Sequence, residues 1–269
     1  MCEFCTKHGD GKIWYKNAGN YAQDLMSDIR RRQYVKDFLE STIGEGITTL
    51  GRLETIYRKK RQLPARVVKA MVAKAREEHF GQVVPIEDIK TIVEKAATVV
   101  RIPCACRWAA EKKEKRCCYS VSYSAETWYK DLDMKYFGKV PDEGFETVSP
   151  EVAVAQMEQL EEEGAIHTIW TMMTPFVGAI CNCTNQDCLG LRTLAMDVET
   201  LFPGEYVAAV DQDLCDGCGL CAESCQFNAI SSRQMAGGET VAVIDAVKCH
   251  GCGLCRIHCP QEALALFGQ

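Results

Sequence analysis

Two copies of one cysteine spacing near the carboxyl end constrain the fold of this chain more than any other feature. They read Cys215-Asp-Gly-Cys218-Gly-Leu-Cys221-Ala-Glu-Ser-Cys225 and Cys249-His-Gly-Cys252-Gly-Leu-Cys255-Arg-Ile-His-Cys259. Each copy has the spacing C-x2-C-x2-C-x3-C, which is typical of segments that wrap a [4Fe–4S] cubane. Zinc sites usually pair two C-x2-C turns across a longer gap, so the third cysteine favours iron. The spacing therefore predicts two cubanes and a chain that transfers electrons.

Over about residues 205–269 these motifs resemble the bacterial-type two-[4Fe–4S] ferredoxins. The resemblance implies two short antiparallel hairpins, a short helix after each three-cysteine loop, and a fourth cysteine that binds the other cluster. One departure is Gln226, which stands where the family usually has the proline seen at Pro260. The implied ligand sets are Cys215, Cys218, Cys221 and Cys259 for one cluster, and Cys249, Cys252, Cys255 and Cys225 for the other.

Nine further cysteines lie outside this tail and are candidate ligands of another metal centre. Two apolar segments that we expect to be strands end in Cys-x-Cys. Residues i and i+2 of an extended chain face the same side, so two such ends lying side by side would offer thiolates to one centre. Further cysteines follow each motif, and the N-terminus adds a Cys-x2-Cys. The nine are Cys2, Cys5, Cys104, Cys106, Cys117, Cys118, Cys181, Cys183 and Cys188.

From this clustering we predict one or two additional iron–sulfur clusters in the N-terminal region. Structural zinc is the main alternative, and metal-free core cysteines are another. The segments Ile102-Pro103-Cys104-Ala105-Cys106-Arg107 and Cys181-Asn182-Cys183 with Cys188 resemble pieces of uncharacterised anaerobe proteins that fuse a cysteine-rich domain to a dicluster ferredoxin. That resemblance implies no particular activity, and the catalytic residues, if any, are unknown.

Apolar periodicity predicts an α+β fold, with a mainly helical N-terminal region that carries a small cysteine-bearing sheet. Pro203-Gly204 marks a boundary between this domain, residues 1–203, and the dicluster ferredoxin-like domain, residues 204–269. Gly44-Glu45-Gly46 is expected to end the first helix. The expected helices cover 20–43, 47–60, segments opened by Pro64 and Pro85, a segment from Ser149-Pro150 to about Gly164, and 187–201; the expected strands cover 98–103, 165–170 and 176–180.

Composition and charge exclude several classes of protein. The formal net charge of −6 disfavours nucleic-acid binding. No stretch approaches 18 consecutive apolar residues, so we expect no transmembrane segment. The first residues, Met1-Cys2-Glu3-Phe4-Cys5, lack the basic start and apolar core of a secretory leader. Because thiolates reserved for iron must stay reduced, we expect a cytoplasmic protein in an anaerobic setting.

The leading hypothesis is an iron–sulfur electron-transfer protein, a subunit or partner of an anaerobic oxidoreductase. It would relay single electrons through two C-terminal [4Fe–4S] clusters and at least one N-terminal cluster to a redox partner protein. The alternative is a reductase whose N-terminal metal centre acts on a small substrate, with the tail as its electron feed. A redox sensor is a third hypothesis, which the acidic charge balance disfavours. The sequence identifies neither the partner nor the substrate.

Overall fold

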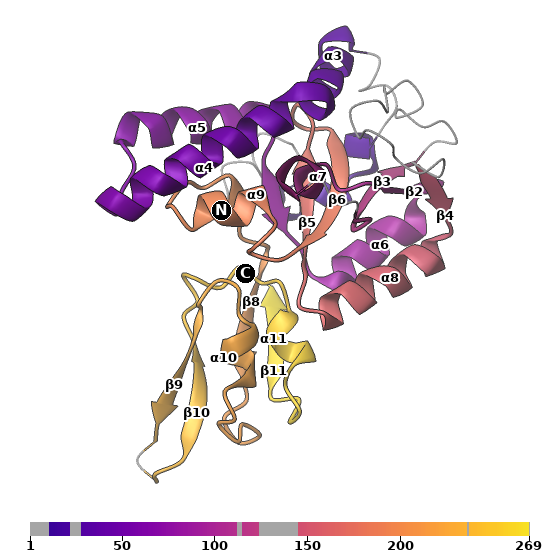
Figure 1. Ribbon diagram of the computed structural model, residues 1–269. Helices are drawn as coiled ribbons and strands as arrows, with labels where there is room; N and C mark the ends of the chain where they lie inside the picture. The colour runs from indigo at the N-terminus through magenta and orange to yellow at the C-terminus, as the bar shows by residue number, and fades with distance from the viewer. Residues whose placement is uncertain (1–10, 22–27, 112–114, 124–144, 236, 269) are drawn as a thin grey trace.

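The computed structural model describes residues 11–21, 28–111, 115–123, 145–235 and 237–268. It is an α+β fold, with one large sheet in the N-terminal region and a smaller unit formed by the tail (Figure 1). The helical segments up to Glu78 are η1 (Gly11–Lys16), η2 (Ala18–Tyr21), α3 (Ile29–Asp37), η3 (Phe38–Thr42), α4 (Ile43–Lys60) and α5 (Ala65–Glu78). The rest of the N-terminal region contains β1 (Gly81–Val83), α6 (Ile86–Lys95), β2 (Thr98–Ile102), α7 (Ala105–Glu111), β3 (Cys118–Ser122), β4 (Glu146–Val148), α8 (Pro150–Glu162), β5 (Ile166–Thr171), β6 (Val177–Cys183), α9 (Leu189–Leu194) and β7 (Leu201–Phe202).

The sheet is larger than the sequence predicts. It has seven strands in the order β4-β2-β3-β6-β5-β1-β7, and its strands pair antiparallel except for β1 with β7. The expected strands at 98–103, 165–170 and 176–180 correspond to β2, β5 and β6. Strands β1, β3, β4 and β7 are too short or too poor in β-branched residues to have been predicted.

Several helix predictions agree with the structure, and two are wrong. Pro64 and Pro85 precede α5 and α6, and the Ser149 hydroxyl caps α8 by accepting a hydrogen bond from the Val152 N–H. Gly44 and Gly46 do not end a helix: a π-helical turn, η3, joins α3 to α4, which runs through both glycines. A helical glycine costs about 1 kcal/mol, and the burial of Ile43, Leu50 and Leu53 on α4 offsets this cost. The helix expected over 187–201 is confined to α9.

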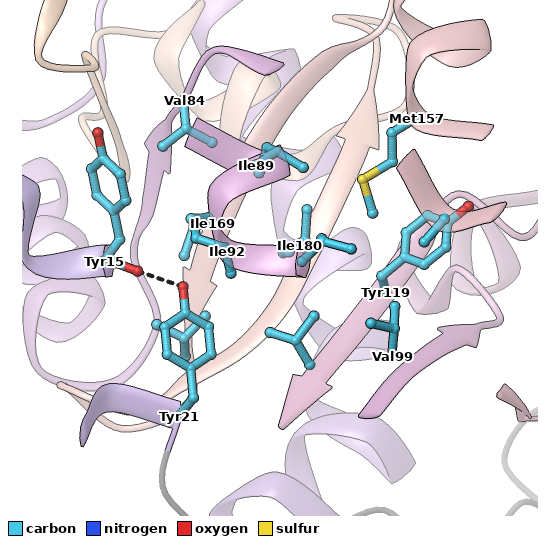
Figure 2. Close-up of a cluster of buried hydrophobic side chains, with 14 of the residues drawn as sticks. Tyr15, Tyr21, Val84, Ile89, Ile92, Val99, Tyr119, Met157, Ile169 and Ile180 are labelled. Atoms are coloured by element: carbon cyan, nitrogen blue, oxygen red, sulfur yellow. Dashed lines mark hydrogen bonds between the residues drawn. The ribbon is translucent and has the colours of Figure 1, made fainter. Parts of the chain in front are cut away.

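One face of the sheet packs against α6 and α8 and forms the largest core. Figure 2 shows part of it, with Ile89 and Ile92 of α6 against Ile169 and Ile180 of the strands, and with a hydrogen bond of 2.6 Å from the Tyr21 hydroxyl to the Tyr15 carbonyl. Because side chains alternate along a strand, the neighbours of Ile180 and Tyr119 point to the opposite face. The cysteines of β3 and β6 lie on that opposite face.

The tail consists of β8 (Tyr206–Val210), α10 (Leu220–Ser224), β9 (Ile230–Gln234), β10 (Thr240–Ile244), α11 (Leu254–Ile257) and β11 (Leu264–Gly268). β9 pairs with β10 as a hairpin, whereas β8 pairs with β11, so the first and last strands of the tail close it. The tail contacts the N-terminal region through polar groups as well: Arg256 of α11 forms an ion pair of 2.8 Å with Glu87 of α6, and the Tyr206 hydroxyl donates to Asp88 over 3.0 Å.

Candidate metal centres

Eight cysteines of the tail surround two small cavities, four to each. One cavity, of about 20 Å³, is lined by Cys215, Cys218, Cys221 and Cys259. The other, also of about 20 Å³, is lined by Cys225, Cys249, Cys252 and Cys255. The structure therefore brings together the same two sets of four that the ferredoxin resemblance implies, although ligation by these cysteines stays a prediction.

Glycines shape the loops that present the first three cysteines of each set. Gly217 and Gly251 have φ values of +73° and +67°, in the left-handed region that favours glycine. A Cβ added at Gly217 would collide with the carbonyl oxygen of Thr240, and one added at Gly251 would collide with that of Tyr206. Each loop thus lies directly against a strand of the tail, which accounts for the glycine between the first two cysteines of both copies.

Backbone N–H groups point at cysteine sulfurs with the same internal symmetry. The N–H groups of Ala208, Ala229, Ala242 and Ala263 lie 3.4 Å from Sγ of Cys249, Cys225, Cys215 and Cys259, respectively. Each set of four thiols thus receives two such bonds. Hydrogen bonds to cluster sulfurs raise the reduction potential of iron–sulfur sites, because they stabilise the reduced, more negative state.

The surroundings of these thiols suit a bound metal better than free thiolates. Burial raises the pKa of Cys255 to about 12 and raises the pKa of Cys252 as well. Thiolates at these positions need a positive charge nearby, which iron would supply. Four converging thiols, an enclosed space and sulfur-directed N–H groups together fit a [4Fe–4S] cluster in each cavity.

In the N-terminal region three adjacent strands carry the cysteine site. Cys118 of β3 pairs across the sheet with Ile102 of β2 on one side and with Cys181 of β6 on the other. The expectation that the two Cys-x-Cys strand ends lie side by side is therefore wrong, because β3 lies between them. Cys104 and Cys106 also differ from the expectation: β2 ends at Ile102, and Cys106 belongs to the first turn of α7.

Seven of the nine N-terminal cysteines converge in this place. Within the described residues, Cys104, Cys117 and Cys118 form the one group of three potential ligands whose sulfurs all lie within 4.8 Å of one another. Cys183 is hydrogen-bonded to Cys104 and Cys117, and Cys188 to Cys183. The set, which we call the seven-cysteine site, comprises Cys104, Cys106, Cys117, Cys118, Cys181, Cys183 and Cys188. Cys2 and Cys5 lie outside the described residues.

Arg107 provides a positive charge at the seven-cysteine site, a role that the cysteine motifs do not predict. Its Nη1 donates to Sγ of Cys117 over 3.2 Å, and its Nη2 donates to Asp187 over 2.5 Å. Burial alone would lower the pKa of Arg107, but Cys117, Cys183 and Asp187 raise it further than burial lowers it. Hydrogen bonds from Cys117, Cys118 and Cys183 lower the pKa of Cys104 well below its ordinary value. An arginine directly after a Cys-x-Cys motif was the available sequence signal.

The spacing of the sulfurs bears on what this site can hold. Tetrahedral ligation of one zinc ion at about 2.3 Å places its sulfurs about 3.8 Å apart. A cubane spreads its four thiolates farther, since each binds a different iron. The compact group Cys104, Cys117 and Cys118, with Cys183 nearby, fits a single ion. The remaining thiols lie farther out and give the site the wider sulfur spacing that a cluster needs. The residues therefore fit either type of metal centre.

A cavity of about 250 Å³ adjoins the seven-cysteine site. It lies between the sheet and α4, α7 and α9, on the opposite face of the sheet from α6 and α8. Six of the seven cysteines line it, all except Cys117. Its other walls include Phe38, His79, Trp170 and Met172.

The seven-cysteine site and one tail cavity meet in a shared apolar cluster. Cys183 and Cys188 are buried in the same cluster as Leu254 of α11, with Cys252 and Phe227 packed against it. Phe227 also stacks on His250, with ring centroids 4.0 Å apart and planes within 3°. The cysteine set that contains Cys252 is thus the one next to the N-terminal region. The other set contains Cys218, which is exposed to solvent.

One comparison with known protein families supports the ferredoxin-like prediction for the tail. Among the helices of the described residues, none combines the length and the apolar character that crossing a bilayer requires. A search of curated proteins finds no match to the sequence. Residues 214–263, which include all eight tail cysteines, match the family model of the 4Fe-4S dicluster domain, so the tail is an iron–sulfur ferredoxin domain.

Proposed function

We propose that this chain is an electron-transfer subunit or dedicated partner of an anaerobic oxidoreductase, acting in the cytoplasm. Residues 204–269 form its ferredoxin domain and hold two [4Fe–4S] clusters through the two sets of four cysteines. Residues 1–203 hold at least one further iron–sulfur cluster at the seven-cysteine site. The observation that carries the proposal is the apolar cluster shared by Cys183, Cys188, Leu254 and Cys252, because it packs side chains of two candidate redox sites together.

The two tail sites have different neighbours, which sets the order of the sites along the relay. The set with Cys218 faces solvent and suits exchange with a redox partner protein. The set with Cys252 packs against the seven-cysteine site. Electrons therefore pass between the partner and the N-terminal centre through the exposed site first and the inner site second, or in the reverse order.

The residues of the chain contribute binding, insulation and potential. When bound, each cluster accepts or releases one electron at a time. The cysteines hold the irons, the four alanine N–H groups stabilise the reduced state, and apolar residues such as Leu254 exclude water. Arg107 next to Cys117 favours added negative charge at the N-terminal centre.

Anaerobic iron, sulfide and zinc quantitation tests the number of centres. Two cubanes account for about eight irons per chain, and a third raises the count to about twelve. A count near eight with one zinc would replace the third cluster by a structural ion and end the relay at the tail. EPR under stepwise reduction would then show two interacting centres rather than three.

A pair of cysteine variants tests the order of the relay. Cys218→Ser removes a ligand of the exposed site, and Cys252→Ser removes one of the inner site. With an external protein reductant, Cys218→Ser should slow reduction of the inner site and of the N-terminal centre. Cys252→Ser should leave reduction of the exposed site intact and block reduction of the N-terminal centre. Equal behaviour of the two variants in rapid-mixing spectroscopy would contradict the proposed order.

A second candidate function is a reductase fed by the ferredoxin domain. The cavity beside the seven-cysteine site favours it, since a centre that only relays electrons needs no adjoining space. A small ligand that enters the cavity would then change the EPR signal of the N-terminal centre. Signals that no small ligand alters would favour the pure relay.

A further inference from the structure

The cavity beside the seven-cysteine site is far larger than either cavity that fits a cubane in the tail. Measured in the same way, it is about 250 Å³, and each tail cavity is about 20 Å³. A metal centre held by the cysteine wall would leave much of this space unfilled. Cavities of this size are uncommon in protein interiors, because an unfilled volume lowers the stability of the fold.

We propose that this cavity binds a small, uncharged, apolar molecule next to the N-terminal metal centre. The inference deepens the second candidate function and depends on it only for the chemistry that follows binding. Binding itself depends on the shape and polarity of the walls, which belong to the protein. Ligand binding can therefore be tested in either case, with an iron–sulfur cluster or with a zinc ion at the cysteines.

The absence of charged side chains among the described lining residues favours an uncharged ligand. Of the described residues that line the cavity, none is Asp, Glu, Lys or Arg. The polar side-chain groups are the hydroxyls of Ser120, Thr42, Thr193 and Thr200, the His79 ring, the thiols and the Trp170 indole N–H, which donates to Thr168. Moving an ion from water into such surroundings costs several kcal/mol without a partner of opposite charge. Thiolates on one wall would further repel an anion.

His79 behaves as an uncharged wall residue. Its Nδ1 lies 2.6 Å from the carbonyl oxygen of Thr171, a contact that requires the proton on Nδ1. Burial lowers the pKa of His79 to about 4, so the ring is neutral near pH 7. Neutral imidazole adds no charge that could hold an anionic ligand.

Aromatic rings form another part of the cavity wall. The His79 ring stacks on Trp170, with centroids 4.8 Å apart and planes 26° apart, and lies 4.3 Å from the ring of Phe38. Rings with this arrangement offer flat apolar surfaces, which suit an aromatic or alkyl group. Met172 adds a flexible side chain that adapts to the shape of a ligand.

Gly46 of α4 is a position at which a substitution can block the cavity. It is exposed, it lines the cavity, and a Cβ added there would meet no atom within 4 Å. Gly51 is an exposed glycine of the same helix that also has open space around it, but it does not line the cavity. Gly46→Trp should fill the entrance, and Gly51→Trp is its matched control.

The test uses anaerobically purified full-length protein and two probes of similar size, toluene and benzoate, in equilibrium dialysis. We expect saturable binding of toluene at about one molecule per chain. Gly46→Trp should weaken toluene binding by about tenfold or more, and Gly51→Trp should change it by less than about twofold. Benzoate should bind at least about tenfold more weakly than toluene, because of its charge.

Three results would overturn the inference: no saturable toluene binding to the wild-type protein, equal binding of benzoate, or toluene binding that Gly46→Trp leaves unchanged. Metal content and EPR spectra recorded on the same samples separate this failure from that of the proposed relay. If Gly46→Trp does not fold, as judged by circular dichroism, Gly46→Leu with Gly51→Leu provides the same comparison.

Discussion

The side-chain oxygen of Gln226 accepts a hydrogen bond of 2.6 Å from the backbone N–H of Asn185. The amide nitrogen of the same side chain donates to the carbonyl oxygen of Gly164. Both partners belong to the N-terminal region, whereas Gln226 directly follows the last cysteine of the first motif. The glutamine that departs from the ferredoxin pattern therefore fastens the tail to the rest of the molecule.

Gln226→Leu should weaken this junction. It leaves an N–H and a carbonyl without their partner, at a cost of about 1–3 kcal/mol in the free energy of unfolding. Urea denaturation measures the loss. Gln261→Leu is the control, because Gln261 bonds Asp216 within the tail, and it should cost less than about 0.5 kcal/mol. Equal effects of the two substitutions would show that the junction depends on other contacts.

Gly217→Ala should remove one cluster from the tail. Its Cβ would collide with the Thr240 carbonyl oxygen, so the loop that carries Cys215 and Cys218 could not lie against β10. The iron content should fall by about four per chain. Gly219 also has a positive φ, of +83°, but open space around it, so Gly219→Ala should cost only about 1–2 kcal/mol and keep its iron. Iron loss in both variants would mean that backbone strain at a positive φ, rather than the collision with Thr240, causes the loss of the cluster.

Arg107→Met should alter the N-terminal centre specifically. It removes the positive charge next to Cys117 and leaves Asp187 without its ion-pair partner, so stability should fall by about 2 kcal/mol. The reduction potential of the N-terminal centre should also fall, because the reduced state loses a stabilising charge. Redox titration followed by EPR measures this shift. In Arg101→Met, which disrupts the Arg101–Glu146 pair of the β2–β4 edge, the potential should stay unchanged.

His79 should make the protein less stable in weak acid. Burial lowers its pKa to about 4 in the folded chain, against an ordinary value of 6.5. The unfolded chain therefore takes up a proton first as the pH falls, and stability that is present above pH 6.5 is lost toward pH 4. Between pH 7.5 and 5.5 the loss should be about 1 kcal/mol in urea denaturation. His79→Phe should remove this part of the pH dependence, and an unchanged slope in that variant would assign it to other groups.

The tail could be predicted in detail because its determinants are local. Three of each four cysteines lie within one tight loop, and glycines such as Gly217 and Gly251 mark where that loop must turn. The partition of the fourth cysteines, by contrast, came from the family resemblance. Spacing alone does not say that Cys225 lies beside Cys249 rather than Cys215.

The N-terminal site was predicted in its composition but not in its arrangement. The Cys-x-Cys motifs indicate a shared centre, yet the sequence does not predict β3 between them, because a charged stretch precedes Cys117-Cys118. Pairing between distant strands depends on packing that a single sequence does not reveal. Arg107 and His79 were missed for the same reason, since each acts through residues far away in the sequence.

The row formed by Ile102, Cys118 and Cys181 also has a consequence for how the protein matures. A slip of β3 by one residue would turn Cys118 toward α8 and away from the other thiols. Metal loading at this centre must therefore wait until three distant strands have settled in register, whereas each tail loop can offer three thiolates as soon as it is synthesised. If this centre binds iron, it would be the last to fill in a cell that is short of iron.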